Sequence, residues 1–174
     1  SGGPGSGVYV THDGGVRWTH ATTGLPKSPL GKIDVSIAQS NPKRIYALIQ
    51  TADQGSLWRS EDAGVTWKVV SWDRSLIGRA GYYIKLMVNP KNPDDVFIAN
   101  SSFHRSIDGG VTFGARAGGA GAQGGVRGAG PGARAGAPAG AAAPVLTVAG
   151  GGRGASCGDC HAMWIDPKNP QRYA

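Results

Sequence analysis

Long hydrophobic runs are missing from this chain of 174 residues. Its longest apolar run, residues 141–149, is about half of the ~20 residues that a membrane helix needs, and it contains a proline. A basic and apolar leader is not recognisable, so no signal in the sequence shows the compartment. Apolar residues at helical spacing are missing as well. These absences argue against a membrane-spanning helix and against helical structure in general.

Acidic and aromatic residues are absent from one stretch, residues 114–155, which instead holds 15 of the 30 glycines and four arginines. Such a composition cannot bury a core, so we expect a disordered Gly/Ala-rich loop insertion. Its arginines supply more than half of the formal net charge of +7, so the basic pI reflects this stretch more than the fold. Without aromatic side chains to stack on bases, it does not indicate nucleic-acid binding.

The rest of the chain contains a phrase that occurs three times, at residues 11–18, 60–67 and 106–113, with the pattern [ST]-x-D-x-G-x-x-[WF]. An aspartate in such a turn accepts hydrogen bonds from backbone N–H groups, and the glycine permits positive φ. The aromatic residue is expected to pack between neighbouring sheets. We therefore interpret these residues as structural and not catalytic: Asp13, Gly15, Trp18, Asp62, Gly64, Trp67, Asp108, Gly110 and Phe113.

A second phrase, built around Asn-Pro, alternates with the first and begins at Ile37, Val88 and Ile165. The aspartates of the first phrase are 49 and then 46 residues apart, but about 30 extra residues follow Asp108. The repeat predicts blades over residues 1–113, the loop insertion at 114–155, and the first strands of another blade at 156–174.

Alternating apolar residues and turn signals predict four short strands in each unit. In the second unit they span residues 33–37, 45–50, 56–59 and 66–70, and in the third unit 84–88, 96–100 and 102–105. Four antiparallel strands in about 48 residues are typical of a propeller blade, so the predicted fold is all-β. We expect an incomplete propeller fragment with an exposed sheet edge, completed by remaining blades or other chains.

These phrases resemble those of the Asp-box, or bacterial neuraminidase repeat, β-propellers. The stretches at residues 55–62, 79–83 and 158–167 are similar to bacterial exported proteins related to the sortilin propeller domain. The resemblance covers everything outside the Gly/Ala-rich stretch. It implies a secreted or periplasmic protein, and it is specific for fold more than for function, because sialidases, xyloglucanases and sortilin-type receptors share the motif.

If the strands alternate in direction, both phrases lie on one face and the other connections lie on the opposite face, where propellers usually bind ligands. The candidate ligand-binding residues on that rim are Arg79, Tyr82, Tyr83, Asp159 and His161. The alternative is structural: the two tyrosines alternate between core and channel, Arg79 is a solvated charge, and Asp159 caps a turn.

Two classes of function follow from this rim. The first is a sortilin-like binding or scaffold propeller for a peptide or glycan. The second is a carbohydrate-active glycoside hydrolase, which needs two carboxyl groups across the sugar bond. The sequence contains no recognisable carboxylate pair and no positions matching the arginine triad of sialidases, and it has Ala162 where many relatives of the resembled group carry an acid.

Both cysteines belong to Cys157-Gly-Asp-Cys160-His161, which fits the C-x-x-C-H pattern of c-type haem attachment. A third function class is therefore a haem-bearing electron-transfer protein, although no sixth iron ligand is marked. The same residues are compatible with a disulfide, with free thiols, or with a metal site that Asp159 would complete. We expect no cofactor and no metal, with haem c as the alternative.

Overall fold

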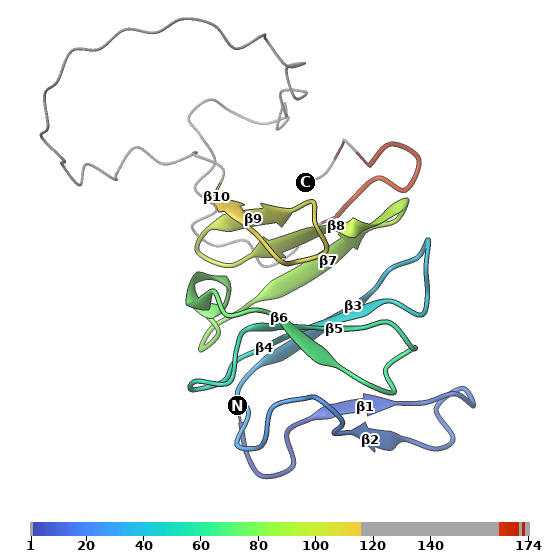
Figure 1. The fold of residues 1–174 in the computed structure, drawn as a ribbon, viewed down its shortest axis with the longest axis vertical. Coiled ribbons are helices and arrows are strands. Elements are labelled where there is room, and N and C mark those ends of the chain that lie inside the picture. The colour runs from blue at the N-terminus through green and yellow to red at the C-terminus, as the bar shows by residue number, and fades with distance from the viewer. Residues whose placement is uncertain (1, 116–163, 171, 173–174) are drawn as a thin grey trace, which may run out of the picture.

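A computed structural model describes residues 2–115, 164–170 and 172. In this part the chain forms three antiparallel sheets that follow one another in a row (Figure 1). The first is a hairpin of β1 (Val8–Val10) and β2 (Thr19–Ala21). The second contains β3 (Ile33–Ile37), β4 (Ile45–Ile49), β5 (Leu57–Ser60) and β6 (Lys68–Ser71). The third contains β7 (Lys85–Asn89), β8 (Asn92–Ala99), β9 (Phe103–Ser106) and β10 (Gly114–Ala115).

The predicted all-β fold of four-stranded antiparallel blades is confirmed, because the second and third sheets each pair four strands in chain order. Strand boundaries agree with the predicted ones to within a few residues. Two details differ. A short 3-10 helix, η1 (Arg74–Ile77), follows β6, and β10 pairs Gly114 with Arg105, inside the stretch predicted to be a loop insertion. Residues 116–163, where most of that insertion was predicted, lie outside the described residues.

Strand β4 shows how each sheet packs against both of its neighbours. All five of its residues are buried, and they alternate between two apolar clusters. Ile45 and Ile49 belong to a cluster with Val8 of the first sheet, whereas Tyr46 and Leu48 belong to a cluster that includes residues of β7 and β8. A strand buried on both faces reads as a continuous apolar run, and this is why residues 45–49 lack polar alternation.

The three Asp-Gly turns, residues 11–18, 60–67 and 106–113, have one geometry. In each, the hydroxyl of the Ser or Thr that begins the turn accepts a hydrogen bond from the glycine N–H four residues later, at 2.9 Å. In each, the aspartate Oδ1 accepts from the backbone N–H four residues later, at 2.8–2.9 Å. Gly15, Gly64 and Gly110 have φ of 94°, 91° and 87°, which a residue with a Cβ adopts only at a cost. The repeated pattern therefore encodes one repeated turn.

In the second and third Asp-Gly turns, the aromatic residue packs toward the sheet that precedes it in the chain. Trp67 is buried in the cluster between the first two sheets, and Phe113 packs against the cluster between the second and third. Trp18 differs from the prediction, since it is 60% exposed. The physical reason is that no described sheet precedes the β1–β2 hairpin, so its indole has nothing to pack against in this part of the chain.

Within the described residues, no helix has the length and apolar character needed to cross a membrane.

Candidate functional site

Connections between strands gather at two opposite edges of the sheets. One, here called the turn edge, carries the Asp-Gly and Asn-Pro turns, and the other, the loop edge, carries residues 50–56, 72–84 and 100–102. On the turn edge Ala63 N–H donates to the Lys43 carbonyl at 2.8 Å, and on the loop edge Arg74 Nη2 donates to the Thr51 carbonyl at 3.0 Å. These contacts confirm the predicted separation of the two kinds of connection.

The segment from β6 to β7 crosses the loop edge, and its local structure is set by η1. Asp73 caps this turn, since its Oδ1 accepts the Ser75 N–H at 2.9 Å. Leu76 and Ile77 are buried in the core, and Asn100 Nδ2 donates to the carbonyls of Ser75 and Leu76, both at 2.9 Å. Hydrogen bonds from the third sheet therefore hold η1 in place, and they fix the position from which the following residues start.

Arg79, Tyr82 and Tyr83 come together directly after η1. The Arg79 guanidinium carbon lies 6.0 Å from the Tyr82 ring centroid and 5.9 Å from that of Tyr83. The two rings meet edge to face with centroids 6.5 Å apart. Both tyrosine N–H groups donate to the Arg79 carbonyl, at 2.8 and 3.0 Å. The sequence-predicted trio thus forms one compact group.

The two tyrosines differ sharply in exposure. Tyr83 is 5% exposed, and its hydroxyl donates to the Asn100 carbonyl at 3.2 Å, so it serves as a buried anchor. Tyr82 is 70% exposed and presents its ring to solvent. Lys32, which precedes β3, donates from Nζ to the Tyr82 carbonyl and so adds a second cation to the surroundings of Tyr82. The group is a solvent-facing aromatic ring on a rigid, positively charged support.

Sequence reasoning missed Lys32 and a second exposed aromatic of this edge, Trp72, which is 61% exposed. Nothing in the sequence marked Lys32, because its contact joins residues 50 positions apart. Trp72 could have been found from the sequence, because it is a large aromatic residue directly after the predicted fourth strand of its unit.

The predicted partners Asp159 and His161, and also Cys157 and Cys160, lie outside the described residues, so their roles remain predictions. Among the described residues, no cluster of three metal-ligating side chains occurs.

A pocket of about 310 Å³ lies on the same edge, beside the first hairpin. Its walls include His20, Lys27, Ser28 and Leu30. The pocket is lined by the segment that links β2 to β3, and the same segment continues to Lys32. The loop edge therefore combines a concave surface with the exposed Tyr82 ring.

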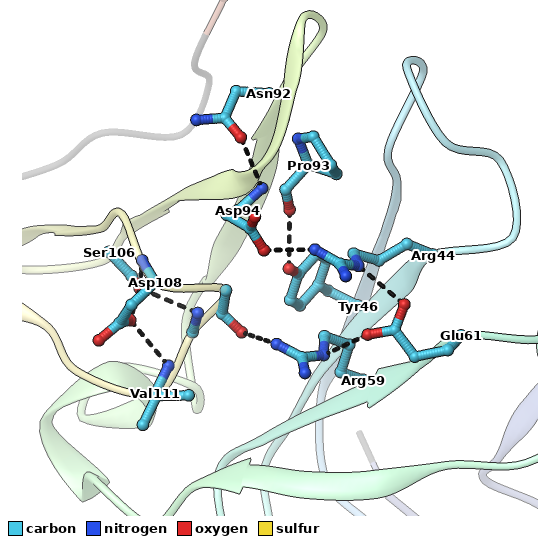
Figure 2. A network of polar contacts seen from close by, with 12 residues as sticks. Arg44, Tyr46, Arg59, Glu61, Asn92, Pro93, Asp94, Ser106, Asp108 and Val111 are labelled. Carbon is cyan, nitrogen blue, oxygen red and sulfur yellow. Dashed lines mark hydrogen bonds and ion pairs between the residues drawn. The ribbon is translucent and has the colours of Figure 1, made fainter.

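The turn edge carries a different polar network, drawn in Figure 2. Arg44 pairs with Glu61 at 2.9 Å and with Asp94, and it thereby joins the second sheet to the third. Arg59 lies 2.8 Å from the other Glu61 oxygen and donates from Nη1 to the Gly109 carbonyl at 2.8 Å. Every charge in this network is engaged within the fold, so we assign it to sheet packing.

Almost all described carboxylates form a hydrogen bond or an ion pair within the fold. Asp34 accepts the Leu86 N–H at 2.8 Å, Asp95 pairs with Arg105 at 2.7 Å, and Asp166 accepts the Lys168 N–H at 2.8 Å. The turn aspartates, Asp73, Glu61 and Asp94 have the partners given above. Only the exposed loop residue Asp53 has none described here. In the described part of the chain, these carboxylates therefore contribute mainly to holding turns and sheets together.

The turn aspartates are held ionised by their hydrogen bonds. The Thr66 hydroxyl, with backbone N–H and Ser60 donors, lowers the pKa of Asp62 to about 2. The Ser106 and Thr112 hydroxyls lower the pKa of Asp108 to about 2 in the same way. The Arg17 N–H and the Thr11 hydroxyl also lower the pKa of Asp13. Groups that are permanent acceptors are poor proton donors near neutral pH, and this agrees with their structural interpretation.

The chain matches no protein-family model, and no curated protein matches it. Among solved structures it is similar to a GH74 enzyme from Niastella koreensis, with 26% identity over 46% of this chain and a TM-score of 0.37. The chain covers 13% of that enzyme's length.

Proposed function

We propose that this chain is part of an Asp-box β-propeller that binds a peptide or glycan on its loop edge, with Arg79 and Tyr82 as contact residues. The repeated hydroxyl and aspartate hydrogen bonds of the three Asp-Gly turns support the first half of this proposal. The exposed Tyr82 ring, held beside Arg79 on a buried base, supports the second half.

The binding proposal depends on one observation, the exposed ring of Tyr82 beside the buried Tyr83. Folding gains little from leaving a tyrosine ring 70% exposed, whereas binding gains a large contact area at low cost in side-chain entropy. An aromatic face stacks on a sugar ring or an apolar side chain. A guanidinium beside it pairs with a carboxylate through two parallel hydrogen bonds. With Lys32 nearby, this chemistry favours a ligand that carries a carboxylate.

The experiment is a calorimetric titration with three probes: 3′-sialyllactose, a cello-oligosaccharide and a tetrapeptide with a free C-terminal carboxylate. We expect one carboxylate probe to bind, and we expect Arg79→Gln and Tyr82→Ala each to weaken its binding at least tenfold. Matched controls are Arg17→Gln, an exposed arginine of the turn edge, and Tyr9→Ala, a 45% exposed tyrosine of the first hairpin. Equal losses in the control variants would contradict the proposal, as would the absence of binding by all three probes. Hydrolysis of a sugar probe would instead favour the glycoside hydrolase.

We further propose, from the sequence resemblance, that the protein is secreted or periplasmic. In such an oxidising compartment we propose that Cys157 and Cys160 form a disulfide. An intact mass lower than that of the reduced protein by two hydrogen atoms checks this proposal. A mass increase equal to one haem would replace it with the c-type haem alternative.

A further inference from the structure

The pocket beside the first hairpin, of about 310 Å³, has an apolar floor that includes Val8, Leu25 and Leu30. Val8 and Leu30 are 6% and 4% exposed and belong to the apolar cluster between the first two sheets. Leu25 is partly buried and packs against the same cluster. The floor of the pocket is therefore part of the surface of this core, and it offers apolar contacts to a ligand that enters.

The second sheet holds one wall of the pocket, the segment between β2 and β3, at two points. Trp67 N–H donates to the Thr23 carbonyl at 2.9 Å. The Gln54 side chain accepts the Lys27 N–H at 2.8 Å and donates to the Lys27 carbonyl at 3.1 Å. These hydrogen bonds fix the backbone of the wall within the fold. The cost of ordering the wall therefore falls on folding and not on ligand binding.

His20 of β2 also lines the pocket. Its ring stacks on that of Tyr9, with centroids 4.6 Å apart and 15° between the two planes. A Cβ at position 7 would lie only 2.2 Å from His20 Nε2, so Gly7 leaves the space that the imidazole occupies. The stacked ring and the missing side chain together set the position of His20 at the pocket.

The charge of the lining is positive. Among the described residues that line the pocket, Lys27 carries a formal charge, and none is an aspartate or a glutamate. Its side chain is exposed and extends from the backbone that Gln54 holds. An ammonium group beside an apolar floor favours a ligand with an apolar body and one carboxylate, because charge-assisted hydrogen bonds are the strong ones. The volume is close to the lower end of the range for ligand pockets, so this ligand is small.

We propose that this pocket is a binding site for a short aliphatic monocarboxylate. The hydrocarbon part packs on Val8, Leu25 and Leu30, and the carboxylate accepts a hydrogen bond from the Lys27 ammonium group. The site uses none of the residues that bind the ligand under Proposed function, so the two proposals stand or fall separately.

The test follows the amide chemical shifts of the ¹⁵N-labelled 174-residue chain during titration with 4-methylpentanoate. We expect saturable shifts in residues 20–30. Two further probes separate the parts of the ligand: 4-methylpentan-1-ol has the apolar body without the charge, and acetate has the charge without the body. Each should bind at least fivefold more weakly than 4-methylpentanoate. The proposal is overturned if 4-methylpentanoate gives no saturable shift, if the alcohol binds equally well, or if the shifts are confined to residues 79–83.

Two variants test the contacts, each with a matched control. Lys27→Met removes the charge and keeps a long side chain, and it should weaken 4-methylpentanoate binding at least fivefold without weakening the alcohol. Lys68→Met, at an exposed lysine of β6, is its control. Leu25→Ala shortens the floor and should weaken the acid and the alcohol alike, with Val65→Ala, at a 61% exposed turn position, as its control. Binding that is unchanged in Lys27→Met, or that falls equally in Lys68→Met, overturns the proposal.

Discussion

Trp67 and Trp18 donate the same indole hydrogen bond, each to the carbonyl of the glycine three residues before it, at 3.0 and 3.1 Å. Yet Trp67 is 5% exposed and Trp18 is 60% exposed. The turn therefore sets the position of the indole, and the neighbouring sheet decides whether that position is buried. Trp67 and Trp18 should therefore contribute unequally to the free energy of unfolding, although their local geometry is the same.

We expect Trp67→Ala to lower the free energy of unfolding by about 3–5 kcal/mol, because it empties a packed site between two sheets. Trp18→Ala should cost less than about 1 kcal/mol, because little apolar area is lost. Urea unfolding, followed by circular dichroism at a concentration where the chain is monomeric, measures both changes. Similar losses in the two variants would show that the turn, and not the contact between sheets, is the source of stability.

Acid should destabilise the fold in a defined pH range. The pKa values of Asp62 and Asp108 are lowered to about 2 in the fold, from the ordinary aspartate value of 3.8. A lowered carboxyl pKa adds stability above the unfolded value, and this stability is lost as pH falls through the folded value. The melting temperature should therefore fall between about pH 4 and pH 2.

The matched variants for this prediction are Asp62→Asn and Asp108→Asn. Each should melt at a lower temperature at neutral pH and should lose less on acidification than the unmodified chain. Asp53→Asn, an exposed loop position, is the control and should leave the pH profile unchanged. A profile that is the same in all the variants would mean that the turn aspartates are not the source of acid sensitivity.

The Tyr46 hydroxyl joins the second and third sheets, since it donates to the Pro93 carbonyl at 2.7 Å while its ring is fully buried. We expect Tyr46→Phe to keep the packing and to cost about 1–2 kcal/mol, because a partly buried carbonyl loses its donor. Tyr9→Phe is the control, since its hydroxyl bonds the Gly5 carbonyl at an exposed site. Urea unfolding of both variants checks the prediction, and equal costs would contradict it.

Local signals were enough to predict the repeated elements. The Asp-Gly turns follow from a hydroxyl, an aspartate and a glycine at fixed spacing, because each of the repeated hydrogen bonds joins residues only four positions apart. The alternation of residues 33–37 and the apolar run of residues 45–49 specified strands. The grouping of Arg79 with Tyr82 was also local, since the residues are three positions apart.

Long-range contacts were not predictable in this way. Lys32 reaches the Tyr82 carbonyl, and Arg44 reaches Asp94, in both cases across 50 positions of the chain. The η1 turn depends on Asn100, which donates to Ser75 and Leu76 from the neighbouring sheet. No local pattern marks such partners, because only the packing of one sheet on the next brings them close.

The sequence by itself determined that this protein is built from repeated four-stranded units, since strand alternation and turn chemistry are properties of adjacent residues. Only the tertiary structure decided which equivalent residues are buried. Trp18 and Trp67 have the same turn, and Ile37 and Val88 have the same place in the repeat, but their exposures differ widely. Burial depends on the neighbouring sheet, and that neighbour is not encoded at the residue itself.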